Sequence, residues 1–298
     1  MGVVEAWLAD LHRVLNGRSL TVSDVRIGVF YTAVQLSSGH VGAAFTPRDL
    51  ADTVCCPQTA GAAPPAGRMA GQEAWPLARY ALSPVPLRRS VGVAVLNALS
   101  ALAVEEHGVP GGRVLPGADA LQVAEVRPEE DVAMVGSFIP FIKALKGRAG
   151  QLWVVDKHPE ALKPDEADFW RPPVRAKEVL SKAAVVVITG SALVEGGIDD
   201  LLFAASCARK VVLAGPTASP WPRPFFERGV HVLGGIRVLD GPKMLRLVSE
   251  GGSGYFFGDV AEKVCVVCEA CARARNPEAG EAAASKTCLE AEPGKVSP

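Results

Sequence analysis

Apolar residues in the first part of the chain change their spacing, and each spacing predicts a different element. They recur every three to four positions over 3–16, which predicts an amphipathic helix that Asn16-Gly17 ends. They alternate with other residues over 25–36, which predicts a strand, and a Ser-Ser-Gly turn separates it from a second strand over 41–45. The chain is therefore expected to open as a helix followed by a hairpin.

Three further helices are expected before the pattern breaks, one of them a helical stretch with Ala74, Leu77 and Ala81. Thr46-Pro47 predicts the start of a short helix through Val54. An almost continuous apolar run predicts a long buried helix over 86–106, and its core from Val91 to Val104 is too short to span a bilayer. Glycines and prolines then gather in 108–128, which indicates a boundary.

From Asp131 onward, short continuous apolar runs alternate with helical stretches. Five strands are expected, at 132–135, 152–155, 184–188, 211–214 and 231–233 together with 238–240. Such runs are typical of strands buried on both faces, hence of a parallel sheet. The sequence predicts an α/β protein: a small α+β domain over 1–115, a Rossmann-like domain over 116–271, and a disordered tail over 272–298.

Charge and cysteine content narrow the choice of partners. The 298 residues carry 31 basic and 32 acidic side chains, a net charge of −1, so neither nucleic acid nor a membrane surface is an expected partner. The first ten residues lack a secretory pattern, and we expect a cytoplasmic protein whose seven cysteines are reduced. A homo-oligomer is compatible with the sequence.

The candidate chemistry lies in the loops after the predicted strands, because parallel sheets bind ligands outside the carboxyl ends of their strands. Two of these loops, Thr189-Gly190-Ser191 and Gly215-Pro216-Thr217, pair a glycine with hydroxyl groups. Exposed backbone N–H groups there could hold an anion or a carboxylate ligand. Ordinary strand-to-helix turns are the alternative interpretation.

The loop after the first of these strands does not favour a dinucleotide. Asp156 lies 20 residues after Gly136, the spacing at which an acid reaches a ribose hydroxyl. The fingerprint nevertheless needs three glycines, whereas this loop contains Phe138 and Pro140, which would crowd a pyrophosphate.

Three acids near strand ends are candidates for the same site: Asp156, Glu195 and Asp199. Converging carboxylates could coordinate a cation or act as general acid and base, and solvated surface charge is the alternative. Cys265, Cys268 and Cys271 form a separate metal candidate, since closely spaced thiolates suit zinc or an iron–sulfur cluster. A strand that runs into a loose tail would explain the cysteines equally well.

Several motifs, in order, resemble one known family. The segments 25–34, 41–46 and 93–100 resemble the DUF4213-type, enolase-N-terminal-like domain that precedes the DUF364 domain. The segments 135–140, 188–193, 198–199, 215–217 and 229–230 resemble the DUF364 heavy-metal chelation domain itself. The chain departs from the family at Glu195-Gly196-Gly197, where the family usually shows Asn-Gly-Thr, so the charge of a ligand contact there can differ.

The resemblance implies a cleft between an enolase-N-terminal-like domain and a Rossmann-like domain. It also directs attention to Tyr31, Thr32 and Asn97 of the first domain as groups offered into that cleft, with a structural hydrogen bond as the alternative for Asn97. The expected function is binding of a small anionic ligand, or of a heavy metal, in the cleft. A lyase or transferase that acts on a small metabolite in the same cleft is the alternative.

Overall fold

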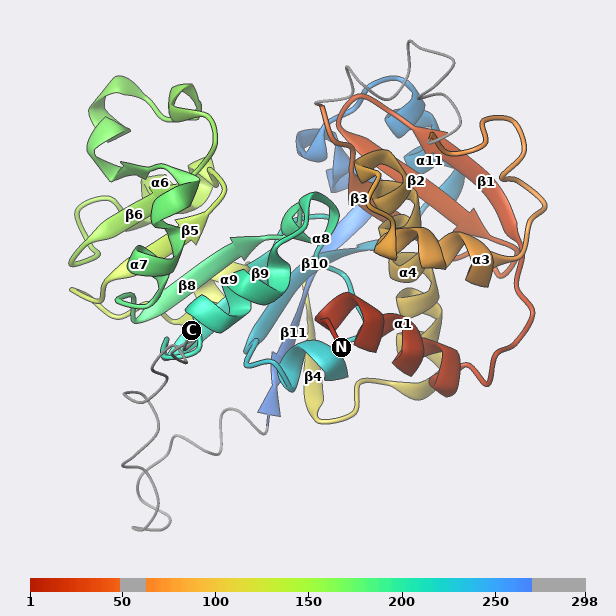
Figure 1. Cartoon of the computed structure of the whole chain (residues 1–298), viewed down its shortest axis with the longest axis horizontal. Coiled ribbons are helices and arrows are strands. Elements are labelled where there is room, and N and C mark those ends of the chain that lie inside the picture. The colour runs from red at the N-terminus through yellow and green to blue at the C-terminus, as the bar shows by residue number, and fades with distance from the viewer. Residues whose placement is uncertain (49–62, 270–298) are drawn as a thin grey trace, which may run out of the picture.

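The computed structural model describes residues 1–48 and 63–269, which form two sheets with helices packed around them (Figure 1). The smaller sheet is antiparallel with the order β1-β2-β3, and the larger has the order β4-β11-β10-β9-β8-β5-β6-β7. The predicted α/β class, with a large and mainly parallel sheet beside a smaller first unit, is confirmed. Most of the helix expected over 47–54, and the tail expected from 272, lie outside the described residues.

The strands are β1 (Val22–Ile27), β2 (Tyr31–Leu36), β3 (Val41–Phe45), β4 (Gly112–Pro116), β5 (Val132–Val135), β6 (Leu152–Val155), β7 (Trp170–Arg171), β8 (Val185–Thr189), β9 (Lys210–Ala214), β10 (Val232–Val238) and β11 (Ala261–Cys268). The α-helices are α1 (Val3–Val14), α3 (Ala74–Ala78), α4 (Pro86–His107), α5 (Ala120–Ala124), α6 (Ile139–Leu145), α7 (Ala176–Leu180), α8 (Ala192–Glu195), α9 (Ile198–Ala204), α10 (Arg223–Phe226) and α11 (Gly241–Ser249). Short 3₁₀ helices are η1 (Arg79–Leu82), η2 (Pro159–Ala161), η3 (Pro164–Phe169), η4 (Pro173–Arg175) and η5 (Gly254–Asp259).

The strand expected over 25–36 is in fact a hairpin, β1 and β2. Its turn is closed by a hydrogen bond from Gly28 N to Tyr31 O (2.9 Å). Gly28 also passes close to α11, since a Cβ there would lie 2.1 Å from the Val248 carbonyl oxygen. The turn contains the apolar residues Val29 and Phe30, so the alternating pattern continues through it and does not indicate a turn.

The four predicted strands β5, β6, β8 and β9 form the centre of the large sheet. The parallel strands follow the order β7-β6-β5-β8-β9-β10, which is the 3-2-1-4-5-6 order of doubly wound nucleotide-binding sheets. From β5 the chain adds β6 and β7 on one side of the sheet, and it then returns to the other side of β5 to add β8, β9 and β10. The switch point therefore lies between the carboxyl ends of β5 and β8.

The fifth strand is continuous, where the sequence predicted two pieces. Gly234 and Gly235 interrupt its apolar pattern, but both lie inside β10. Their neighbours come too close for a side chain: a Cβ at Gly234 would lie 2.4 Å from the Ala120 Cβ, and one at Gly235 would lie 2.3 Å from the Ser219 Oγ. The glycines permit close packing and do not end the strand.

Three strands of the large sheet were not among the five predicted: the short parallel strand β7 and the antiparallel strands β4 and β11, of which β11 appeared only in the alternative interpretation of the cysteines. β11 pairs with β10 and β4 pairs with β11. β4 begins at Gly112, within the glycine- and proline-rich stretch predicted as a boundary, so this segment contributes an edge strand to the large sheet.

Helix α4 is the centre of the first unit. It is the one described helix long and apolar enough to span a bilayer by length and composition, but 78% of its apolar window is buried inside the protein. It covers one face of the small sheet, and α11 from the C-terminal half covers the other. A single hydrophobic core runs from Trp7 and Leu96 to Val186 and Leu213, so the two parts of the chain share their interior.

Candidate functional site

The turns after β5 and β8 meet at the switch point of the large sheet. Gly136 has a φ of +92°, and a Cβ there would lie 3.0 Å from the Thr189 Cβ. Glycine is therefore required both by the backbone conformation and by the close approach of the neighbouring turn. Phe138 lies beside the next turn, since a Cβ at Gly215 would be 3.9 Å from its ring, whereas Pro140 is exposed in the first turn of α6.

The turns after β8 and β9 also touch. A Cβ at Gly190 would lie 3.0 Å from the Thr217 Cβ and 2.8 Å from the Ala218 nitrogen. Thr189 Oγ1 accepts a hydrogen bond from Ser191 N (3.3 Å) and so shapes the turn before α8. The three strand-end loops predicted as a site thus form one contiguous group.

The first unit closes this group from one side. Thr217 Oγ1 accepts a hydrogen bond from Phe45 N (2.9 Å), and Asn97 Nδ2 donates to the carbonyls of Ala43 (2.8 Å) and Thr217 (3.0 Å). Asn97 is only 2% exposed, and its Oδ1 has no hydrogen-bond partner within the described residues. Its amide therefore ties α4 to both β3 and a strand-end turn, as the structural interpretation predicts.

Tyr31 and Thr32 point to opposite faces of β2, as neighbours in a strand do. Thr32 is fully buried and accepts a hydrogen bond from Ser90 Oγ (2.9 Å), which places it inside the first unit. Tyr31 packs against Phe257 with ring centroids 4.9 Å apart, and a Cβ at Gly254 would lie 3.3 Å from its hydroxyl and 3.5 Å from Pro216. Burial raises the pKa of Tyr31 to about 12, although Arg48 acts in the opposite direction, so the phenol is protonated at neutral pH.

Two of the three predicted acids lie at the strand ends. Asp156 accepts hydrogen bonds from Ser137 Oγ (2.7 Å) and His158 N (3.0 Å), which link the ends of β5 and β6. Glu195, at the end of α8, forms an ion pair with Lys157 (2.8 Å). Both carboxylates are thus already engaged.

Asp199 was predicted to lie in the cleft with the other two acids, but the structure places it elsewhere. Its Oδ1 accepts hydrogen bonds from Val3 N and from Arg228 Nη1, each at 2.9 Å. The first turn of α9 therefore faces the start of α1, where a carboxylate stabilises the N-terminal end of a helix. Asp199 connects the two parts of the chain away from the strand-end turns.

Positive charge at the site was missed by the sequence analysis. Arg89 on α4 donates through Nη2 to the Glu195 carbonyl (3.0 Å), and burial lowers its pKa because the charged guanidinium is desolvated. Arg48 stacks over the Phe30 ring, 5.1 Å from its centroid, near Tyr31. Together with Lys157, these side chains bring three cations to the neighbourhood of the strand-end turns. In the sequence, the feature that could have indicated this positive charge is Arg89, a charged residue just before an otherwise apolar helical run.

The cysteine cluster does not assemble in the described part of the chain. Cys265 and Cys268 belong to one regular strand, and their odd separation of three directs the side chains to opposite faces. Cys265 is 1% exposed and donates to the Ala118 carbonyl (3.3 Å), and burial raises its pKa to about 11. The side chain of Cys268 is buried as well, and Cys271 lies outside the described residues.

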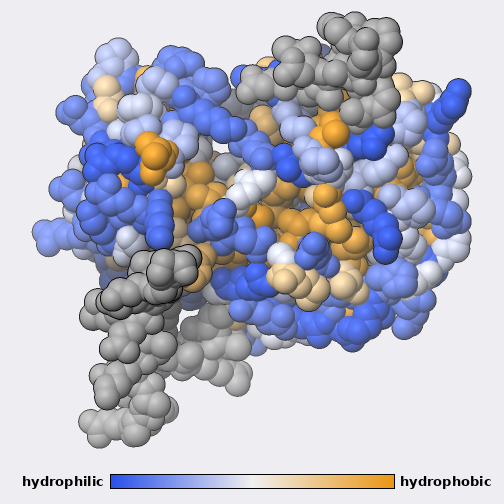
Figure 2. All heavy atoms as spheres, in the orientation of Figure 1, coloured by the Kyte–Doolittle hydropathy of each residue, from blue (hydrophilic) through white to orange (hydrophobic). Residues whose placement is uncertain are grey.

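Side chains that could chelate a metal directly are not gathered anywhere in 1–48 and 63–269. No group of three or more histidine, cysteine, aspartate or glutamate side chains is close enough there to hold an ion. The strand-end turns offer hydroxyls and cations instead, whereas the N–H groups of Gly136, Gly190 and Gly215 already donate to backbone carbonyls. In the space-filling view, the surface is hollowed between the part that carries β5 and β6 and the part that carries β2 and β3, with hydrophobic residues in the recess (Figure 2).

Comparison with known proteins gives a consistent result over most of the chain. Residues 119–267 match the DUF364 family model and residues 11–100 match the DUF4213 model, both described as "Putative heavy-metal chelation". Two DUF364 crystal structures of unknown function share the fold. One, from Desulfitobacterium hafniense, has a TM-score of 0.68 and 19% identity, covering 88% of this chain and 99% of that one. The other, from Pyrococcus horikoshii, has a TM-score of 0.71 and 18% identity, covering 89% and 99%.

An uncharacterized protein of Methanocaldococcus jannaschii is 25% identical over 179 residues, which are 59% of this chain. The match spans 65% of that relative's length. The similarity thus extends to a curated sequence whose name assigns no activity.

Proposed function

The chain belongs to the DUF364 family, and from that premise we propose that it binds a small anionic ligand at the carboxyl ends of β5, β8 and β9. The heavy metal of the family description would be carried on that ligand. A polycarboxylate or a phosphate whose own oxygens hold the metal is the expected chemistry, since hard and borderline cations accept oxygen ligands.

The contact between the strand-end turns is the observation that carries this proposal. Gly136 meets Thr189, and Gly190 meets Thr217, so three loops that carry hydroxyl groups share one edge of the sheet. Parallel strands bind ligands at this edge, next to the point where the strand order reverses. The turns alone are also what ordinary strand-to-helix connections look like.

The charges around the turns favour an anion over a bare cation. Lys157 and Arg89 flank Glu195, so this carboxylate is outnumbered by cations in its surroundings. A metal ion alone would meet these positive charges without a cage of acidic, histidine or cysteine ligands in the described part of the chain. A metal ion held by a chelating anion would reach the site as a negatively charged complex, which the surrounding cations attract.

The engaged carboxylates give no specific support to the enzymatic alternative. Asp156 and Glu195, the two predicted bases, already accept hydrogen bonds from Ser137 and Lys157. A general base needs an acceptor position directed at the substrate. Binding is therefore the function that this geometry supports best.

Calorimetric titration of the metal-free protein tests the proposal, with citrate, Zn²⁺ and the zinc–citrate complex as probes. We expect saturable binding of citrate and of zinc–citrate, and no stoichiometric binding of Zn²⁺ alone. Lys157→Gln and Arg89→Gln should each weaken citrate binding about tenfold, the loss of one charge-assisted contact. Lys182→Gln is the matched control, because Lys182 pairs with Glu178 on α7 and does not contact the turns.

Two results would count against the proposal. Tight binding of Zn²⁺ without citrate would show that the protein itself supplies the metal ligands. Citrate affinity that is unchanged in both variants would show that the strand-end cations do not hold the anion.

A further inference from the structure

A second space between the two parts of the chain lies over the antiparallel strands of the large sheet. Its volume is about 630 Å³, and its walls come from the β2–β3 turn, the C-terminal half of α4, the loop 218–220 and the strands β4, β10 and β11. Small-molecule sites occupy about 300–1,000 Å³ and are mostly apolar. The space is thus large enough for a metabolite.

Small residues form part of the walls. Among them are Ala101 of α4 and Ala43 of β3. Packed interiors leave few voids larger than a water molecule, so an opening of this size is a distinct feature of the interface. Asn97 and Ala218 form the wall nearest the strand-end turns, because Asn97 binds the Thr217 carbonyl directly before Ala218.

One face of the antiparallel strands provides an apolar strip. Leu233 is paired with Val266, and Val266 with Val114, so the three side chains share this face across three strands. Gly235 is paired with Val264, which continues the strip along the strands. All five positions line the cavity.

The strip ends at a charged pair. Arg237 follows Gly235 on the same face of β10 and is paired across the strands with Glu262, with which it forms an ion pair. The Arg237 side chain is 58% exposed, so it can also reach a group in the cavity. The β2–β3 turn approaches this end of the strand, since a Cβ at Gly241 would lie 2.9 Å from both Gln35 Nε2 and Val41.

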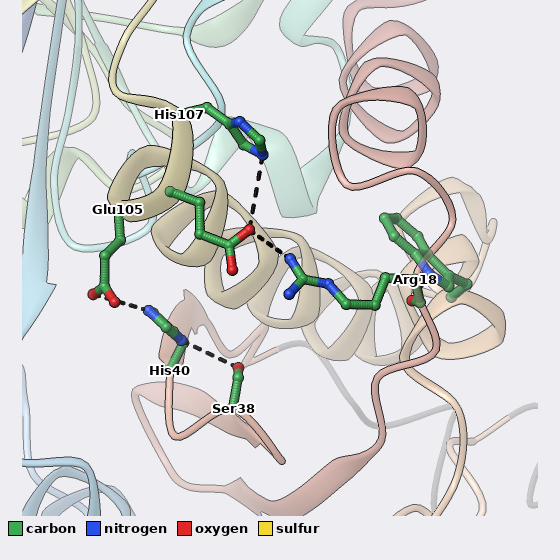
Figure 3. A network of polar contacts seen from close by, with 7 residues as sticks. Arg18, Ser38, His40, Glu105 and His107 are labelled. Atoms are coloured by element: carbon green, nitrogen blue, oxygen red, sulfur yellow. Dashed lines mark hydrogen bonds and ion pairs between the residues drawn. The ribbon is translucent and has the colours of Figure 1, made fainter.

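His40 of that turn adds a second polar group. It reaches Glu105 at the end of α4 (3.2 Å), with its other ring nitrogen 3.1 Å from Ser38 Oγ (Figure 3). Both His40 and Glu105 line the cavity, and their contact joins two of its walls. Next to it, Arg18 and His107 contact the Glu106 carboxylate.

We propose that this cavity binds a mainly apolar small molecule that carries one acidic group. The apolar body would lie on the strip of Leu233, Val264 and Val266, and the acidic group would lie at Arg237. The proposal is independent of the anion site at the strand ends, because the two sites lie on opposite sides of Asn97 and take ligands of different polarity.

A pair of fluorescent probes tests both halves of the proposal. 1-Anilinonaphthalene-8-sulfonate has an apolar body and one acidic group, and N-phenyl-1-naphthylamine is the same body without the acid. We expect saturable binding of the sulfonate at one site per chain and at least about tenfold weaker binding of the uncharged probe, equivalent to the loss of one charged contact. Arg237→Gln should remove most of this difference.

Two substitutions on opposite walls locate the probe. Ala101→Leu and Val264→Phe each fill part of the cavity and should weaken sulfonate binding at least about tenfold. Ala9→Leu, the same change at an exposed position of α1, is the control and should leave binding unchanged. Because the sulfonate also stains loosely packed states, each variant is first compared with the wild type by near-ultraviolet circular dichroism.

The outcomes separate this site from the other one. Sulfonate binding that both filled variants retain would overturn the proposal, as would equal affinity for the two probes in the wild type. Displacement of the sulfonate by citrate would assign the probe to the strand-end site and would also overturn it. Should Ala101→Leu fail to fold, Val264→Phe decides alone.

Discussion

The large sheet has a parallel part, β7 to β10, and an antiparallel part, β11 and β4, and the two parts offer different surfaces to a ligand. In the six parallel strands, every carboxyl end lies on one edge, so the turns after β5, β8 and β9 come together with their glycines and hydroxyls. In β11 and β4, which run antiparallel, neighbouring ends alternate between the edges and no such group forms. Their contribution is a face, on which an apolar strip borders a cavity. Strand direction thus decides whether a sheet offers polar loops or an apolar surface.

Asn97 joins the first unit of the chain to the large sheet, and its removal should have the largest effect on stability. Asn97→Ala takes the amide donor from the buried carbonyls of Ala43 and Thr217. We expect the free energy of unfolding to fall by about 2–4 kcal/mol, since a buried group left unsatisfied costs roughly 1–3 kcal/mol. Urea denaturation measures it, with Ser38→Ala on the exposed turn as the control. A loss below about 1 kcal/mol would show that the first unit and the large sheet are held together mainly by their shared apolar core.

The strand-end turns should be sensitive to a single added methyl group. Gly190→Ala places a Cβ 2.8 Å from the Ala218 nitrogen, which is backbone and cannot rotate away. We expect a loss of about 1–3 kcal/mol in the free energy of unfolding, together with a loss of citrate binding. Gly258→Ala is the matched control, because nothing lies within 4 Å of the Cβ it would add. Equal effects of the two changes would contradict the contact between the turns.

The same contrast explains what could be predicted of the fold. The parallel strands β5, β6, β8 and β9 are continuous apolar runs because both of their faces are buried. β4, at the edge of the large sheet, has no fully buried residue, and its sequence Gly-Arg-Val-Leu-Pro lies in a stretch rich in glycine and proline, so its pattern is that of a loop as much as of a strand. Edge strands are only half-buried, and their sequences carry less information.

The site divides in a similar way. Its turns were predictable, since strand direction alone brings residues such as Thr189 and Thr217 to one edge. Arg48 and Arg89 were not, because they come from the other unit, and their approach depends on how α4 and β3 pack against the sheet. The prediction for Asp199 was wrong for a related reason: it also depended on packing between units, and the first turn of α9 faces α1. The residues at the end of one strand can be predicted from the sequence, whereas contacts between the two units depend on how those units pack together.

Alkaline pH should act on the antiparallel half through Cys265. Burial raises its pKa from 9.0 to about 11, and Asp119 adds repulsion to the thiolate. The folded state therefore prefers the thiol, so this stabilisation is complete below pH 9 and is lost as the pH rises to 11. At pH 10.5 the loss should be about 2 kcal/mol relative to neutral pH. Denaturant unfolding at both pH values measures it.

The comparison of variants isolates the contribution of this thiol. Cys265→Ala should lower stability at neutral pH through the lost packing, but its stability should fall less between pH 7.5 and 10.5 than that of the wild type. Cys207→Ala changes an exposed cysteine and should keep the wild-type pH dependence. Identical pH dependence in all three proteins would show that the Cys265 thiol does not titrate in this way.

The smallest effect on stability should accompany an increase in ligand affinity. Glu195 and Lys157 form an ion pair at the parallel edge, with side chains 35% and 57% exposed. Exposed pairs contribute about 0–1 kcal/mol, so Glu195→Gln should change the unfolding free energy by no more than that. The substitution frees Lys157 and removes a negative charge that competes with the anion, and citrate should bind about three- to tenfold more tightly. Glu178→Gln breaks two exposed pairs, with Arg175 and Lys182, and should alter stability comparably little without any gain in citrate affinity. If citrate binds the Glu195→Gln variant more weakly than the wild type, the carboxylate itself contacts the ligand complex, and the metal would then be shared between the anion and the protein.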